Sequence, residues 1–167
     1  MKQYISMILS AIEAHSEDFA NAGVTPPQTV DVYMGQPSKP EDFEFSLPAV
    51  FVDYAADYDG EVFDLYLHVL QDFADDTENF APNREQGLEY LTFLTVLKRI
   101  LNGIKMKPVF GVLRPYQESP VQTEFYQYHM LAFRCSFDAE ASMQTERYVN
   151  VEPVVPKIEN TWLKVKW

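Results

Sequence analysis

The segment AVFVDYAADYDGEVFDLYLHVLQDF, residues 49–73, decides the fold of this chain. Its opening AVFVDY is rich in β-branched and aromatic residues, as strands are, and the following AADYDG has the residues that turns prefer. The remainder alternates apolar and polar side chains, which predicts a second strand over residues 61–73 with one buried face. The apolar side chains of this second strand are Phe63, Leu65, Leu67 and Val69. The segment therefore predicts a β-hairpin.

An amphipathic helix is predicted on each side of the hairpin. Residues 2–15 and residues 84–102 both repeat apolar side chains at helical spacing, and Gly103 is well placed to end the second helix. Asn83, with Gln86 three residues later, resembles a capping arrangement at its start. Apolar residues occupy two sides of the second helix, Leu91, Leu94, Leu97 and Leu101 on one and Phe93, Val96 and Ile100 on the other. This stripe is wider than contact with one sheet needs, so we expect its second side to contact a neighbouring subunit.

Three more strands complete the predicted sheet. TVDVYM (residues 29–34) is short and alternating, and a pair of strands follows the second helix at residues 109–114 and 121–137. On the last strand, Phe125, Leu131, Phe133, Cys135 and Phe137 share one face, while Tyr126, Tyr128 and Arg134 share the other. Strands joined by hairpins, with helices at two points of the sequence, indicate the α+β class: a mostly antiparallel sheet with two main helices packed on one face.

The C-terminal stretch differs from the rest of the chain. We place the α+β domain at residues 1–140 and an extended C-terminal arm at residues 141–167, where Pro153 and Pro156 disfavour a helix. The arm is either a frayed terminus or a strand donated to the sheet edge of an adjacent subunit. Its two tryptophans and five valines are costly to leave in water, which favours docking.

Charge and composition exclude several classes of protein. The chain has 167 residues and a formal net charge of -12, which argues against nucleic-acid binding by phosphate neutralisation. Residues 41–89 hold fourteen acidic residues and one basic residue, Arg84. No window approaches the apolar length of a membrane span, and the single cysteine, Cys135, has no internal disulfide partner. We therefore expect a soluble protein of a reducing, cytoplasmic compartment, with no membrane and no sequence-specific nucleic acid among its partners.

The residues that carry chemistry do not converge in the sequence. Cys135 lies on an apolar strand face, as a buried inert thiol does. His15, His68 and His129 lack the spacing of metal ligands, although His68 and His129 could face each other across neighbouring strands. The acidic loop Asp72, Asp75, Asp76 and Glu78 lacks the pattern of a calcium loop, and no glycine pattern cradles phosphate. We expect no catalytic residue, metal, cofactor or small-molecule substrate, and no enzyme activity.

Tyr126 and Tyr128 admit three interpretations. Their rings fit a platform for nucleic-acid bases, a protein interface, or plain packing on a sheet. The acidic surroundings disfavour a base platform, which leaves a protein contact and sheet packing open.

The order of these segments resembles the tail terminator, or tail-completion, proteins of long-tailed bacteriophages. The resemblance covers residues 1–140 and lies in MKQYISMILSAI, PAVFVDY, an acidic turn, GEVFDLYLHVLQDF, REQGLEYLTFLTVLKRIL and QTEFYQYHMLAFRCSFD. It implies a structural protein without cofactor or enzyme activity, which forms a hexameric ring, caps the tail tube and joins it to the head connector. It also implies a place in the virion, and in the host bacterial cytoplasm during assembly.

From the predicted faces we select nine candidate interface residues: Tyr126, Tyr128, Arg134, Phe93, Val96, Ile100, Val149, Val151 and Trp162. An alternative function stays open. A small acidic binding module, such as an immunity or inhibitor protein, would use the carboxylates of residues 41–89 to cover a basic partner surface.

Overall fold

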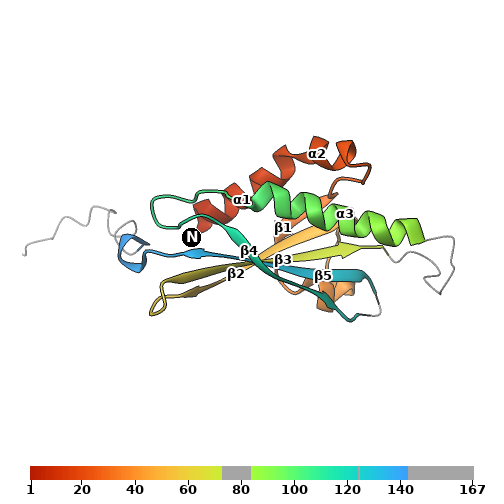
Figure 1. The fold of residues 1–167 in the computed structure, drawn as a ribbon. Coiled ribbons are helices and arrows are strands. Elements are labelled where there is room, and N and C mark those ends of the chain that lie inside the picture. The colour runs from red at the N-terminus through yellow and green to blue at the C-terminus, as the bar shows by residue number, and fades with distance from the viewer. Residues whose placement is uncertain (73–83, 124, 143–167) are drawn as a thin grey trace, which may run out of the picture.

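The computed structural model describes residues 1–72, 84–123 and 125–142 (Figure 1). Their elements in chain order are α1 (Lys2–Ala14), α2 (Ser16–Asn21), β1 (Thr29–Val32), the short 3₁₀ helices η1 (Gln36–Ser38) and η2 (Pro40–Asp42), β2 (Ala49–Asp57), β3 (Val62–Gln71), α3 (Arg84–Leu101), β4 (Arg114–Val121) and β5 (Gln127–Ser136).

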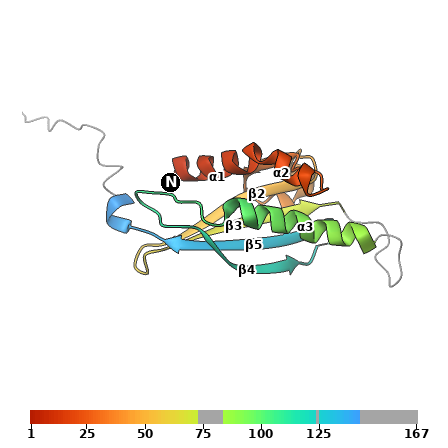
Figure 2. The same ribbon diagram turned by 45° about the horizontal axis from the view of Figure 1, so that its top comes forward.

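One five-stranded sheet organises the described residues, in the order β1-β2-β3-β5-β4. β1 runs parallel to β2, and the other three pairs are antiparallel. α1, α2 and α3 lie on one side of the sheet, as both ribbon views show (Figures 1 and 2). The predicted α+β class, with a mostly antiparallel sheet and two main helices on one face, is therefore confirmed.

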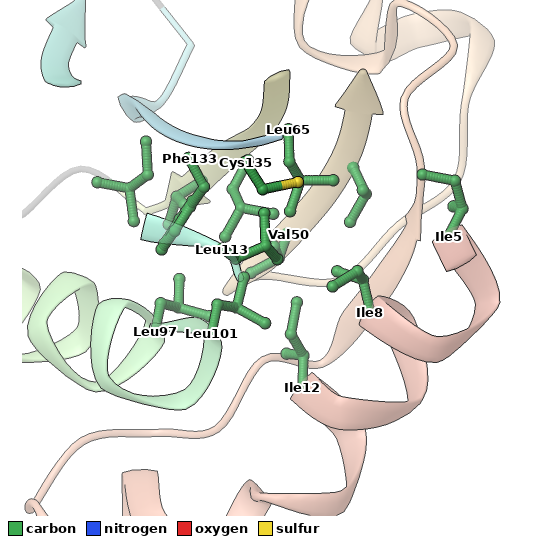
Figure 3. Packing of buried hydrophobic residues seen from close by; sticks show 14 of the residues in the cluster. Ile5, Ile8, Ile12, Val50, Leu65, Leu97, Leu101, Leu113, Phe133 and Cys135 are labelled. Carbon is green, nitrogen blue, oxygen red and sulfur yellow. The ribbon is translucent and has the colours of Figure 1, made fainter. Parts of the chain in front are cut away.

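The main core fills the space between the sheet and its helices. The four apolar side chains of β3 that the alternation predicts, Phe63, Leu65, Leu67 and Val69, are all fully buried. α1 contributes Ile8 and Ile12, and α3 contributes Leu97 and Leu101 (Figure 3). The period-two pattern thus identified the buried face of the central strand.

A second, smaller apolar cluster lies on the opposite face of the sheet. Ala49, Phe51 and Leu70 form its buried part. Side chains from the segment that links β1 to β2 and from the start of β5 pack against it: Tyr33, Phe45, Leu47, Tyr126 and Tyr128. Because this cluster covers only one end of the sheet face, the other end stays open.

The last two strands differ from the prediction. The segment expected as a strand at residues 109–114 makes only isolated bridges, and β4 begins at Arg114. Pro115 and Pro120 made β4 hard to predict, because proline usually argues against a strand. It is tolerated in β4 because this is an edge strand, where the missing N–H can face away from the neighbouring strand. Residues 122–126 lie between β4 and β5, so the expected long strand is divided and Phe125 is not on the buried face.

The second apolar side of α3 is used within the chain, which corrects the expected subunit contact. Phe93 and Val96 are buried in the core, and Ile100 is partly buried against it. The Phe93 ring lies 4.9 Å from the ring of Phe19 in α2, a helix that the sequence reading did not separate from α1. The stripe is wide because α3 packs on the sheet and on the first two helices together.

Other predictions end at the limits of the described chain. α3 ends at Leu101, one residue before the expected end, and Gly103 lies two residues further on with a φ of 93°, a conformation that favours glycine. Ala139 and Ala141 still pack against the core. The arm residues Val149, Val151 and Trp162, the cap residue Asn83 and most of the acidic loop lie outside the described residues.

We predict that Leu67→Asp unfolds the domain. Leu67 has 0% exposure in the centre of the sheet, and an unpaired buried charge costs several kcal/mol, about the whole stability of a domain. Leu91→Asp is the matched control, because Leu91 is 50% exposed. Thermal unfolding followed by circular dichroism should show a cooperative transition for the control only; a folded Leu67→Asp variant contradicts the assigned strand faces.

Candidate protein interface

An arginine–tyrosine cluster occupies the open end of the sheet face opposite α1, α2 and α3. Arg134 of β5 donates two hydrogen bonds to Asp64 of β3, from Nε to Oδ1 at 2.7 Å and from Nη2 to Oδ2 at 2.9 Å. The guanidinium carbon lies 4.4 Å from the ring centroid of Tyr116 in β4. Three strands therefore hold one cationic side chain in a fixed position.

Tyr66 of β3 completes this arginine–tyrosine cluster. Its partial burial and its hydrogen bond with Tyr116 raise the pKa of Tyr66 to about 12, so the phenol is protonated at neutral pH. The hydrogen bond with Asp64 is the main reason that the pKa of Arg134 is raised, so the guanidinium stays charged. A fixed arginine beside two tyrosines on an open sheet face has the composition of protein interfaces, where tyrosine and arginine are enriched.

Tyr126 and Tyr128 do not join this arginine–tyrosine cluster. The Tyr128 hydroxyl lies 2.5 Å from Nδ1 of His68, and the Tyr126 ring packs 5.8 Å from that of Phe45. Both tyrosines therefore pack on the smaller apolar cluster, and both also line a hollow beside α3, so sheet packing and a protein contact both stay open for them. Among the three residues selected on the last strand, only Arg134 lies on the open end of the sheet.

A hollow of about 780 Å³ lies between α3 and the β4–β5 connection, and we call it the α3 hollow. Tyr90 and Leu91 of α3 line one side, while Val121, Tyr126 and His129 are among the residues of the other side. Leu91 is 50% exposed, and Leu88, one helical turn away, is 53% exposed. These two leucines form an exposed apolar surface on α3 beside the hollow.

Phe125 adds to the apolar surface at the α3 hollow. It stands in sequence between the lining residues Thr123 and Tyr126, and its side chain is 57% exposed. Sequence reasoning missed this site because it assigned Leu91 and Phe125 to buried faces. The sequence did contain an indication of this site. Leu88 and Leu91 are three residues apart and so lie on one face of the helix, while other apolar residues already fill the side that packs on the core.

Tyr90 forms a buried part of the α3 hollow. Its side chain is almost fully buried, its ring lies 5.3 Å from that of His129, and its hydroxyl has no hydrogen-bond partner among the described residues. Burial raises the pKa of Tyr90 well above its ordinary value. The hollow therefore has a mixed lining of apolar and polar side chains over the buried Tyr90 ring, a composition suited to a protein side chain.

Among the described residues, the histidines and the cysteine considered in the sequence analysis have separate surroundings. The described ranges contain no group of three or more histidine, cysteine, aspartate or glutamate side chains able to hold a metal ion. His68 and His129 are one register position apart on neighbouring strands and contact different partners, Tyr128 and Tyr90 respectively, so they do not face each other. Burial raises the pKa of Cys135 to about 11, which keeps the thiol protonated.

None of the helices in the described ranges combines the length and the apolar character that crossing a bilayer requires. Comparison with known proteins adds no family: no family model matches the chain, and no curated protein matches it.

We predict that His68 makes the domain less stable in acid. His68 stacks on Tyr33 with 3.9 Å between ring centroids, its Nε2 is buried without a partner among the described residues, and burial lowers its pKa below 6.5 despite the nearby Asp53. Below pH 6.5 the unfolded chain thus binds more protons than the folded chain, so stability falls as the pH drops from there towards the pKa of the folded state.

His68→Phe keeps a ring against Tyr33 and removes this titration. Urea midpoints measured over a pH series should fall less steeply below neutrality in the variant than in the wild type, and His129, whose pKa burial also lowers, accounts for part of the remaining slope. Equal slopes in the two proteins would show that His68 does not titrate differently in the folded state.

Proposed function

We propose that this chain is a structural assembly protein of the phage tail terminator type. In this role it forms a ring by contact between copies, caps the tail tube and joins it to the head connector. It acts through shape and surface chemistry, without enzyme activity or cofactor. The observation that carries the proposal is the exposure of Leu91 in the lining of the α3 hollow, with the exposed Leu88 one helical turn away and the exposed Phe125 next in sequence to a lining residue. Exposed apolar surface of this kind marks interaction sites.

A closed ring requires two different surfaces on each copy. In a head-to-tail contact, one patch of a subunit meets another patch of the next, and a rotation that closes gives a ring. The α3 hollow and the arginine–tyrosine cluster of Arg134, Tyr66 and Tyr116 supply two such patches, one beside a helix and one on the opposite face of the sheet. Aromatic and arginine side chains on one patch complement apolar walls with a buried phenol on the other.

The surface charge supports a second candidate function. Asp53 and Asp57 of β2 lie on the same sheet face as Asp64, and Arg134 pairs with Asp64 alone. The carboxylates of Asp53 and Asp57 suit a basic protein partner, as an immunity or inhibitor protein would need. Native mass separates the two functions, because a ring requires self-association and an inhibitor requires a one-to-one complex.

We predict that Leu91→Asp weakens self-association while the domain stays folded. A charge at the α3 hollow must be desolvated in any contact that covers it, at a cost of about 2 kcal/mol or more, which corresponds to a loss of affinity of about thirtyfold. The measurement is native mass over a concentration series, by sedimentation or native mass spectrometry.

Met34→Asp is the matched control for this experiment. Met34 is 73% exposed and lies beyond β1, outside the α3 hollow, so the same kind of substitution should leave association unchanged. Equal association of wild type and Leu91→Asp would remove the α3 hollow from the subunit contact. A wild-type chain that stays monomeric at the highest concentration, also with tail tubes present, would contradict the ring.

A further inference from the structure

A second groove lies at the start of α1, away from the two surfaces above. It has a volume of about 690 Å³ and aromatic residues among its walls. The ring centroids of Tyr4 and Phe110 are 4.5 Å apart, those of Phe110 and Phe137 are 5.1 Å apart, and Tyr58 lies 5.1 Å from Phe137. We call this the α1 groove.

The chain itself passes the rim of the α1 groove. Ser142 lines the groove and is the last residue of the final described range. After the five residues 143–147, the sequence reads YVNVEPVV over residues 148–155, which holds one tyrosine and four valines. From the aromatic walls, the position of Ser142 and this composition, we infer that residues 148–155 bind in the α1 groove of their own chain.

The short tether favours the same chain over a second copy. Residues 143–147 span at most about 18 Å when extended, which is enough for the chain to leave Ser142 and turn back across the groove. A short tether of this kind gives an effective concentration on the order of millimolar. Another copy reaches that concentration only when the protein is very concentrated. This inference therefore does not depend on the ring.

The two edge strands of the sheet are poorer docking sites for residues 148–155 than the α1 groove. β4 carries Pro115 and Pro120, which lack the N–H groups that an added strand needs. At β1, the Val32 N–H donates to Oδ1 of Asp31 at 2.7 Å and the Val32 carbonyl accepts from Nε2 of Gln36 at 2.9 Å. Local side chains therefore already satisfy backbone groups at the end of β1, whereas the α1 groove presents free apolar surface.

The charge at the α1 groove also suits this segment. Tyr4 contributes its ring to the lining, because its hydroxyl is buried. Lys2 is exposed on the groove wall, and Glu152 lies in the middle of residues 148–155 with the opposite charge.

Photocrosslinking in the full-length chain tests this inference. A benzophenone amino acid replaces Ser6, an exposed lining residue of the α1 groove, and in a matched control it replaces Gln117, an exposed residue of β4. Equal amounts of ¹⁵N-labelled and unlabelled protein are mixed before irradiation. Tryptic peptides are then identified by mass spectrometry, which distinguishes links within a chain from links between chains.

We expect Ser6 to crosslink to the tryptic peptide 148–157 of the same isotopic composition, and Gln117 not to do so. The double variant Val149→Asp and Val151→Asp, which keeps residues 1–142 unchanged, should lose the crosslink. Links only between differently labelled chains would overturn the inference and make a second copy the occupant. Absence of any link to residues 148–157, or an equal link from Gln117, would also overturn it.

Discussion

The pairing of β3 on both of its edges is the constraint on which the described structure depends. β3 is hydrogen-bonded to β2 and to β5, with partners for every residue from Val62 to Gln71 on the β5 side. Its helix-facing side chains are fully buried. Because side chains alternate, a shift of one residue in either register would turn Asp64 and Tyr66 towards the helices. Burying these polar side chains would cost free energy, so the observed register is strongly favoured. The register in turn fixes where α1 and α3 pack and places Arg134 opposite Asp64.

Local patterns predicted the parts of the fold that depend on local physics. The alternation of β3, the helical spacing in α1 and α3, and the glycine after α3 each report a requirement within one element. The parallel pairing of β1 with β2 could not be read from TVDV, because it depends on the route of the intervening segment. The wide stripe of α3 was misread for the same kind of reason: Phe19 of α2, far away in the sequence, covers Phe93.

The candidate surfaces were less predictable than the fold. Arg134 was selected correctly as a residue of the exposed face, but its neighbours Tyr66 and Tyr116 come from strands on both sides of β5 and were not selected. The order of strands in the sheet brings them together. Leu91 and Phe125 are apolar by residue type, so only their exposure in the structure distinguishes them from core residues. The sequence shows which side chains are apolar, but which of them are exposed depends on the packing of their neighbours in the fold.

The prolines of β4 have a consequence for how the molecule avoids aggregation. An open sheet edge is a template on which unrelated chains stack into cross-β fibres. Pro115 and Pro120 interrupt that template at both ends of β4, and β1 at the opposite edge has only four residues. Both edges of the sheet therefore disfavour the strand-by-strand stacking that seeds amyloid.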